Sequence, residues 1–346
     1  MKKVLILGGT GNLSKSTVQD LLQHGFDVAI FTRTKIKSKL VSGVKKYTGD
    51  RNIADDLAKA IHNFNPAIVI DFVCYTPEQA ILLLPIIEDR LEQYIFISTV
   101  DVYGYPLSHI PFKETDARNS TNCRYAADKL ACERLFQKSL QMGKLPLTII
   151  RPAYSFGNNF VLTPLSRGGG KHLIPWLRSG KPILTFDNGL TLMHAAVATN
   201  TGSMIAAITG QSFTIGKEYT CGHEQSITQD EYIQIFADSL DVKANIVHVP
   251  SEILINTGHT EIEKTILPIL TRFNIVFSID GFKNDFPGFE WSVSHEQAAK
   301  EYIAFNDAKN NFIDPSILIY EDVIIEAYQN IKNIFKIPNR KYTYID

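Results

Sequence analysis

The chain has 346 residues and is 45% hydrophobic, which is enough for a large core and one or two domains. Its 35 basic and 36 acidic residues give a net charge of -1, so no global field attracts nucleic acid or a membrane. Four scattered cysteines without a C-x-x-C pair indicate reduced thiols in a cytoplasmic protein and predict no metal site. No apolar run approaches the roughly 20 residues of a membrane-spanning helix.

The first half of the chain alternates strand and helix patterns. Apolar runs predict strands at Val4–Leu7, Asp27–Thr32, Lys45–Thr48, Ala67–Val73, Tyr94–Thr99 and Leu147–Arg151. Amphipathic segments predict helices at Ser14–His24, Ile53–His62, Pro77–Leu91 and Cys123–Gln141. Several strands are apolar on both faces, as in a parallel sheet covered by helices on both sides. We expect an α/β fold, a Rossmann doubly wound parallel sheet, over residues 1–155.

Residues 156–346 predict a smaller substrate-binding lobe, with some segments returning to the first domain. The patterns favour helices at His172–Ser179, Ala195–Thr209, Gln229–Leu240 and near Tyr320–Ile334. They favour strands at Ile183–Phe186, Ile246–Val249 and Ile275–Ile279. Thr228 and Glu231 have the spacing of a capping box, which marks the start of the third helix.

The first strand runs directly into a glycine-rich turn, Gly8–Ser14 (G-G-T-G-N-L-S), and then into a helix. Gly8 allows the turn, and Gly11 lets the backbone come close to phosphates because it has no Cβ. A strand, a glycine turn and a helix N-terminus form a site for a dinucleotide pyrophosphate. Ser14 stands where a third glycine is expected, and a glycine turn without a ligand is the alternative interpretation.

A second pattern lies on the fifth strand and the long helix after it. Thr99 ends the strand, at the sheet edge where such folds bind ligands. Tyr125 and Lys129 are four residues apart and share a helix face. An ammonium group beside a phenol lowers the phenol pKa, and a phenolate can take a proton from an alcohol. An ordinary surface pair is the alternative, because Y-x-x-x-K is a common spacing.

Together these motifs make the chain resemble the extended short-chain dehydrogenases/reductases, and among them the NAD(P)-dependent nucleotide-sugar epimerase/dehydratase family. The resemblance covers nearly the whole chain. It rests on G-G-T-G-N-L-S, Gly49-Asp50, I-S-T-V-D-V-Y-G, Y-A-A-D-K, R-P-A-Y-S-F-G and Met193-His194. The segment Asp71–Tyr75 (D-F-V-C-Y) is most similar to the branch that contains the chloroplast stem-loop-binding proteins.

The resemblance implies roles for individual residues. Tyr125 would be the general acid or base, Lys129 would hold the nicotinamide ribose, and Thr99 would orient the substrate hydroxyl. The remaining cofactor contacts that it implies are Gly8, Thr10, Gly11, Asn12 and Leu13 at the pyrophosphate, Asp50 and Arg51 at the adenine end, and Phe72, Val73 and Pro152 along the pocket.

The end of the second strand bears on the choice of cofactor. NAD enzymes of this type place an acid there to bond the ribose hydroxyls. Here the segment has no acid but carries Arg33 and Lys35, which could bind a 2′-phosphate. We therefore favour NADP over NAD, with a solvated basic turn as the alternative.

The segment after Thr99 departs from the resemblance. Sugar 4,6-dehydratases are similar there but carry two acids, whereas this chain has Val100 and Asp101, which disfavours that reaction. Asp101 is either an auxiliary acid or base or a loop carboxylate. Tyr154 replaces an asparagine that binds substrate in many relatives. Further candidates for substrate contacts are Tyr75, Tyr103, Arg167, Lys171 and Arg178, the cations being suited to a diphosphate.

The function that these residues favour is hydride transfer on a nucleotide-activated sugar, with epimerase chemistry first and a keto-sugar reductase or dehydratase as alternatives. A non-catalytic nucleotide- or RNA-binding protein is the alternative of another class, although the chain shows no dense basic stripe. The family resemblance also implies a homodimer packed through Pro77–Leu91 and Cys123–Gln141.

Overall fold

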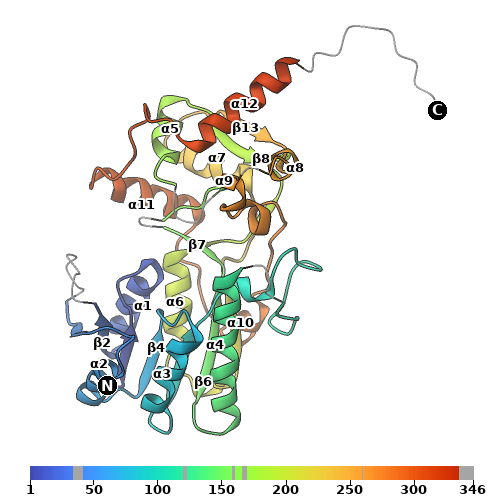
Figure 1. Cartoon of the computed structure of the whole chain (residues 1–346). Helices are drawn as coiled ribbons and strands as arrows, with labels where there is room; N and C mark the ends of the chain where they lie inside the picture. The colour runs from blue at the N-terminus through green and yellow to red at the C-terminus, as the bar shows by residue number, and fades with distance from the viewer. Residues whose placement is uncertain (34–41, 120–122, 158–159, 166–169, 259, 335–346) are drawn as a thin grey trace.

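A computed structural model describes residues 1–33, 42–119, 123–157, 160–165, 170–258 and 260–334. The lower part of the molecule in Figure 1 is built on a central parallel sheet. This sheet has seven strands in the order β11-β6-β5-β4-β1-β2-β3. The strands are β1 (Lys3–Leu7), β2 (Asp27–Thr32), β3 (Lys45–Thr48), β4 (Ile68–Asp71), β5 (Gln93–Ile97), β6 (Leu147–Pro152) and β11 (Glu218–Cys221). This order is that of a Rossmann fold, so the predicted fold class is confirmed.

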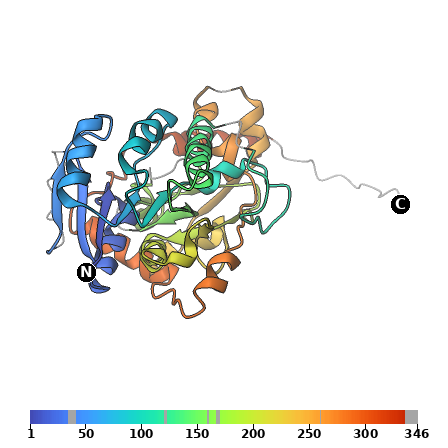
Figure 2. The same cartoon turned by 90° about the horizontal axis from the view of Figure 1, so that it is seen from below.

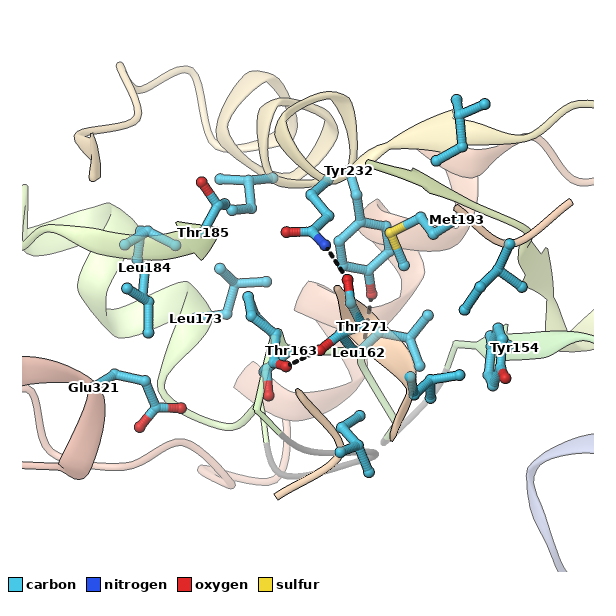
Figure 3. A pocket seen from close by; sticks show the side chains of 18 of the residues that line it. Tyr154, Leu162, Thr163, Leu173, Leu184, Thr185, Met193, Tyr232, Thr271 and Glu321 are labelled. Atoms are coloured by element: carbon cyan, nitrogen blue, oxygen red, sulfur yellow. Dashed lines mark hydrogen bonds between the residues drawn. The ribbon is translucent and has the colours of Figure 1, made fainter. Parts of the chain in front are cut away.

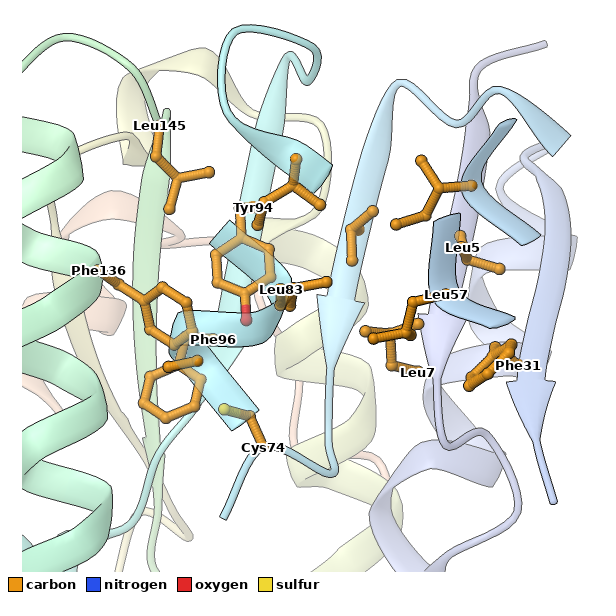
Figure 4. Packing of buried hydrophobic residues seen from close by; sticks show 14 of the residues in the cluster. Leu5, Leu7, Phe31, Leu57, Cys74, Leu83, Tyr94, Phe96, Phe136 and Leu145 are labelled. Atoms are coloured by element: carbon orange, nitrogen blue, oxygen red, sulfur yellow. The ribbon is translucent and has the colours of Figure 1, made fainter. Parts of the chain in front are cut away.

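Helices cover both faces of this sheet, as Figure 2 shows from below. On one face lie α2 (Ala54–Phe64), α3 (Pro77–Ile87) and α4 (Arg124–Gln141), packed on the strands through the buried cluster of Figure 4. On the other face lie α1 (Asn12–Gln23), α6 (Ala198–Ile208) and α10 (Asp280–Asp285). The burial of both faces explains why the strands read as continuous apolar runs.

The second lobe contains short paired strands and several helices. Its strands are β7 (Tyr154–Phe156) with β10 (Ala195–Val197), β9 (Leu192–Met193) with β12 (Ile227–Thr228), and β8 (Ile183–Phe186) with β13 (Ile246–Val249). Its helices are α5 (Leu173–Ser179), α7 (Gln229–Ser239), α8 (Ser251–Asn256), α9 (Thr260–Glu263), α11 (His295–Asp307) and α12 (Tyr320–Ile334). Three short turns of helix, η1 (Val100–Tyr103), η2 (Ser212–Thr214) and η3 (Leu267–Thr271), complete the described elements.

Two predicted helix boundaries and one predicted strand are wrong. The predicted helix 195–209 begins as strand β10, which pairs with β7, and becomes helix α6 only at Ala198. The helix predicted to reach Leu91 ends at Ile87, because the backbone leaves the helical region at Glu88. Residues 275–279 are not a strand and contribute only an isolated bridge between Phe112 and Phe277.

Besides α10, two further segments of the second half of the chain pack on the first domain. Strand β11 extends the central sheet beside β6, and α6 packs against α1. Thr17 Oγ1 donates a hydrogen bond to the Gly202 carbonyl over 3.2 Å, which ties α1 to α6. Helix α6, from the second half of the chain, therefore packs against α1, the helix that follows the glycine turn. Among the described residues, no helix is both long and apolar enough to cross a bilayer.

Candidate functional site

The glycine turn between β1 and α1 needs glycine at two positions. Gly8 and Gly9 have φ of +109° and +89°, a region that other residues rarely adopt. A Cβ on Gly8 would lie 3.2 Å from Val73 Cγ1, and one on Gly9 would lie 2.5 Å from Ile30 Cγ2. The turn is thus packed against β2 and the loop after β4, with no room for side chains.

Ser14 explains how the turn works without a third glycine. Its hydroxyl accepts a hydrogen bond from the Gly11 N–H over 2.9 Å and closes the first turn of α1. The amides of that helix end and its dipole favour an anion. The glycine cradle and the helix end fit the pyrophosphate of a dinucleotide.

A cavity of about 510 Å³ opens from this turn across the carboxyl ends of the sheet strands. It brings together most of the candidate residues named from the sequence. Those that line it are Gly8, Thr10, Gly11, Asn12, Leu13, Phe72, Val73, Tyr75, Thr99, Tyr125, Lys129, Pro152 and Tyr154.

A neighbouring cavity of about 300 Å³ continues from the turn toward β2 and β3. Arg33, Asp50 and Arg51 line it, so this end has room for an adenosine and two cations beside it. Asp50 Oδ1 accepts hydrogen bonds from the Asn52 backbone and side chain, both over 2.9 Å. Lys35 and Arg167 lie outside the described residues.

Arg51 has a structural partner that sequence reasoning missed. Its Nη1 lies 3.2 Å from both carboxylate oxygens of Asp71, which ends β4 and is fully buried. Burial lowers the pKa of Arg51, but Asp71, Cys74 and Tyr94 together raise that pKa above its ordinary value. Asp71 also accepts the Val73 N–H over 2.9 Å and so fixes the loop that lines the cavity. An acid at the end of an apolar strand was the available signal.

Lys129 is held more tightly than its spacing from Tyr125 suggests. Its side chain is 1% exposed, and Nζ donates to the carbonyls of Cys74 over 2.7 Å and Ile97 over 2.5 Å. Burial lowers the pKa of Lys129 below its ordinary value. Tyr125, one turn earlier on α4, is 39% exposed and lines the cavity. The pair therefore joins a fixed ammonium group to an accessible phenol.

Thr99 and Tyr154 contribute two further hydroxyls to the cavity, and Asp101 contacts both residues. The Asp101 N–H donates to Thr99 Oγ1 over 3.2 Å, and Asp101 Oδ1 accepts from the Tyr154 hydroxyl over 2.7 Å. The hydroxyl oxygens of Tyr105 and Tyr154 lie 2.5 Å apart and share a hydrogen bond. The Asp101 side chain is buried, does not line the cavity and lies behind Tyr154.

Three candidate substrate contacts do not reach the cavity. Tyr103 is buried, and its hydroxyl accepts from Arg151 Nη1 over 2.9 Å. Lys171 is exposed and donates to Asn311 Oδ1 over 3.0 Å. Arg178 forms an exposed ion pair with Asp307 at 2.7 Å. These side chains were chosen by type and nearness in sequence, and the fold directs them elsewhere.

The sequence profile of the NAD dependent epimerase/dehydratase family matches residues 4–195, which include the turn, Thr99, Tyr125 and Lys129. The chain belongs to this family. A curated relative, the chloroplast stem-loop binding protein of 41 kDa b from Arabidopsis thaliana, is 26% identical over 246 residues. The match covers 66% of this chain and 61% of that protein, so the chain spans less than two thirds of its curated relative.

Solved structures of low identity share the fold of this family member. dTDP-glucose 4,6-dehydratase from Bacillus anthracis, in complex with NAD, gives a TM-score of 0.70 at 17% identity and covers 91% of this chain and 99% of its own. UDP-glucose 4-epimerase from Thermotoga maritima, with UDP-glucose, gives 0.69 at 16% identity and covers 89% and 99%. At such identities the likeness shows the fold alone.

Proposed function

We propose that this protein binds NAD(P) and transfers a hydride to and from a hydroxyl-bearing carbon of a nucleotide-activated sugar, as an epimerase. The observation that carries the proposal is that Thr99, Tyr125 and Lys129 line the same cavity as the glycine turn. The nicotinamide, when bound, supplies the hydride acceptor and donor. Family membership and the NAD and UDP-glucose complexes of structural neighbours support this assignment.

The protein residues handle the proton of the reacting hydroxyl. Thr99 Oγ1 accepts the Asp101 N–H, which leaves the Thr99 proton to donate to a substrate oxygen. Tyr125 takes the hydroxyl proton as general base and returns it as general acid. The Lys129 ammonium, held by two backbone carbonyls, stabilises the phenolate form of Tyr125 by its charge.

The residues behind Thr99 favour an epimerase over a dehydratase. Val100 is buried and cannot protonate a leaving hydroxyl, and the Asp101 carboxylate is buried behind Tyr154. A keto-sugar reductase uses the same residues but consumes NADPH in each turnover. Stoichiometric loss of NADPH absorbance would therefore select the reductase.

We propose NADP as the preferred cofactor. Arg33 is exposed, lies at the end of β2 and lines the adenosine end of the site. A guanidinium group binds a phosphate through two parallel hydrogen bonds, which a ribose hydroxyl does not offer.

The name of the curated relative raises RNA binding as a second candidate. The chain has a net charge of -1, which does not favour it. RNA binding that survives moderate salt and is unaffected by Tyr125→Phe would support this candidate in place of the enzyme.

We propose a homodimer through α3 and α4, which pack side by side on one face of the sheet. Ile81 on α3 is 57% exposed, an apolar side chain that a partner copy would cover. Ile81→Glu is expected to give a monomer by light scattering, while an unchanged mass would contradict the interface.

The first experiment identifies any dinucleotide released from the purified protein by denaturation, using mass spectrometry. The second compares Tyr125→Phe with Tyr47→Phe, a matched change on β3 outside both cavities. We expect Tyr125→Phe to lower kcat about 100-fold or more without loss of cofactor, because general acid–base catalysis contributes 10² to 10⁴. A protein that binds no dinucleotide, or a fully active Tyr125→Phe, would overturn the proposal.

A further inference from the structure

Tyr75 lies where two cavities meet. It follows β4 and lines both the cofactor cavity and the neighbouring cavity toward β2 and β3. The cavity of the second lobe, drawn in Figure 3, shares Tyr154 and Leu162 with the cofactor cavity, but Tyr75 is not among the described residues that line it. Tyr75 therefore lies on the cofactor side of the reaction site.

The Tyr75 ring contacts both members of the pair formed by Tyr125 and Lys129. The ring centroids of Tyr75 and Tyr125 lie 6.5 Å apart, with the rings tilted by 44°. Lys129 Nζ lies 5.6 Å from the Tyr75 ring centroid, within the range of a cation–π contact. Aromatic rings at such distances attract one another beyond the effect of the area that they bury. The Tyr75 ring therefore supports the Tyr125 ring from outside α4.

This support matters because the Tyr125 side chain is 39% exposed. Lys129, one turn later on α4, is fixed by two backbone carbonyls. An exposed side chain samples several rotamers, and proton transfer requires one that keeps the phenol oxygen beside both the substrate and the Lys129 ammonium group. A ring packed against Tyr125 narrows the set of rotamers.

The loop that carries Tyr75 is held in place by its backbone. The Tyr75 N–H donates to Gln79 Oε1 over 2.7 Å, and Gln79 Nε2 donates to Asn52 Oδ1 over 2.9 Å. The second of these bonds joins the start of α3 to the loop after β3. The position of the Tyr75 ring is therefore fixed by a side chain that bridges two elements of the sheet domain.

We infer that Tyr75 is a positioning residue, whose ring holds the Tyr125 phenol in place for proton transfer. The inference rests on the proposed function and adds a residue outside the motifs that carry Thr99 and Tyr125. Partial burial, with the charge of Asp71, raises the pKa of Tyr75 above its ordinary value, so its own phenol stays protonated at neutral pH. The ring is what the role requires, so phenylalanine should replace Tyr75 and leucine should not.

The test observes Tyr125 directly, by fluorine nuclear magnetic resonance of the full-length protein labelled with 3-fluorotyrosine. The Tyr125 signal is the one that is lost in Tyr125→Phe, and its pH titration needs no substrate. We expect Tyr75→Leu to broaden this signal and to raise the pH at which it titrates by about half a unit or more, because the phenol is no longer held beside the Lys129 ammonium group.

Two control variants separate the role of the ring from a general disturbance. Tyr75→Phe keeps the ring and should leave the titration of Tyr125 unchanged. Tyr47→Leu removes a ring that lies 5.9 Å from Phe64, outside both cavities, and should have no effect. Gln79→Leu keeps the Tyr75 ring but releases its backbone N–H, so it should shift the titration in the same direction by a smaller amount.

The binding of NADP and NAD is measured on the same samples. If the protein binds a dinucleotide but Tyr75→Leu leaves the Tyr125 titration unchanged, or if Tyr75→Leu and Tyr75→Phe change it equally, the role of Tyr75 is overturned and the proposed function stands. If the protein binds neither dinucleotide, the proposed function itself is overturned.

Discussion

The Tyr154 hydroxyl donates a hydrogen bond to Asp101 Oδ1 over 2.7 Å, from the cavity wall to a buried carboxylate. The two residues come from different halves of the fold, β7 and η1. The Tyr105 hydroxyl lies 2.5 Å from the Tyr154 hydroxyl oxygen, so Asp101 and the two phenols form one hydrogen-bonded cluster at the cavity wall. The same Asp101 donates its N–H to Thr99. One residue therefore binds two cavity hydroxyls.

The first prediction concerns Tyr154→Phe. The change removes a donor from a buried carboxylate, so we expect the free energy of unfolding to fall by about 1–3 kcal/mol. It also removes a hydroxyl group that lines the cavity, so KM for the sugar substrate should rise while kcat changes little. Denaturant titration and steady-state kinetics measure both.

Tyr105→Phe is the comparison for Tyr154→Phe, because the Tyr105 hydroxyl lies 3.3 Å from the same carboxylate oxygen and 2.5 Å from the Tyr154 hydroxyl but does not line the cavity. Because Tyr105 touches the cavity only through Tyr154, its loss should raise KM less than the loss of Tyr154 does. Equal effects of the two variants on KM would contradict the role given to Tyr154.

The second prediction concerns Arg33→Gln. Loss of a charge-assisted contact to a 2′-phosphate should weaken NADP binding about tenfold or more and leave NAD binding unchanged. Lys46→Gln, on the exposed β3, removes the same charge nearby and should alter neither affinity. The two dissociation constants are measured by quenching of protein fluorescence. If Arg33→Gln bound NADP as tightly as the unmodified protein does, Arg33 would not bind the 2′-phosphate.

The central sheet could be predicted from the sequence because its strands are buried on both faces. Asp27–Thr32 and Lys45–Thr48 match β2 and β3, and the glycine turn lies where the strand and helix patterns place it. Strand β11 was missed because Glu218–Cys221 is short and mixes polar with apolar residues. Its place beside β6 depends on a contact between segments about 70 residues apart, which no local pattern reports.

The residues of the candidate site also fall into those that the sequence could predict and those that it could not. Residues tied to a local motif, such as Gly8 and Tyr125, lie in the cavity. Residues chosen for their charge, such as Lys171, do not, because the tertiary fold gives them other partners.

The third prediction concerns the contact between α1 and α6. A Cβ on Gly202 would lie 2.0 Å from Ser16 Oγ and 2.8 Å from the Leu13 carbonyl oxygen. Gly202→Ala should therefore push α6 away from α1 and cost about 1–3 kcal/mol of stability, as overpacking does. Cofactor affinity should fall too, because Leu13 belongs to the turn.

Ser203→Ala, one residue along α6, is the control for Gly202→Ala and should be nearly neutral. Adding Ser16→Ala to Gly202→Ala removes the hydroxyl from the collision but leaves the Leu13 carbonyl, so only partial recovery of stability is expected. Thermal unfolding with and without NADP measures these effects. If Gly202→Ala left the cofactor affinity unchanged, the contact between α1 and α6 would not control the conformation of the glycine turn.

The fourth prediction concerns the pH dependence of stability. His194 is buried, its Nδ1 accepts the Phe277 N–H over 3.2 Å, and burial lowers its pKa from 6.5 to about 4. The unfolded chain therefore binds a proton between pH 6.5 and 4 that the folded chain does not, and stability falls as the pH drops through this window. At about 1.4 kcal/mol per pKa unit, the loss from this residue approaches 3 kcal/mol at pH 4.

His194→Asn removes the titration but keeps a side-chain acceptor for the Phe277 N–H. We expect the variant to be less stable than the unmodified chain at pH 7.5 but to lose less stability between pH 7 and pH 4.5. Burial also lowers the pKa of His172 and His223 to about 4, so both proteins retain some acid sensitivity. Their difference at each pH, from urea titrations, isolates His194, and parallel curves would show that this histidine does not couple protonation to folding.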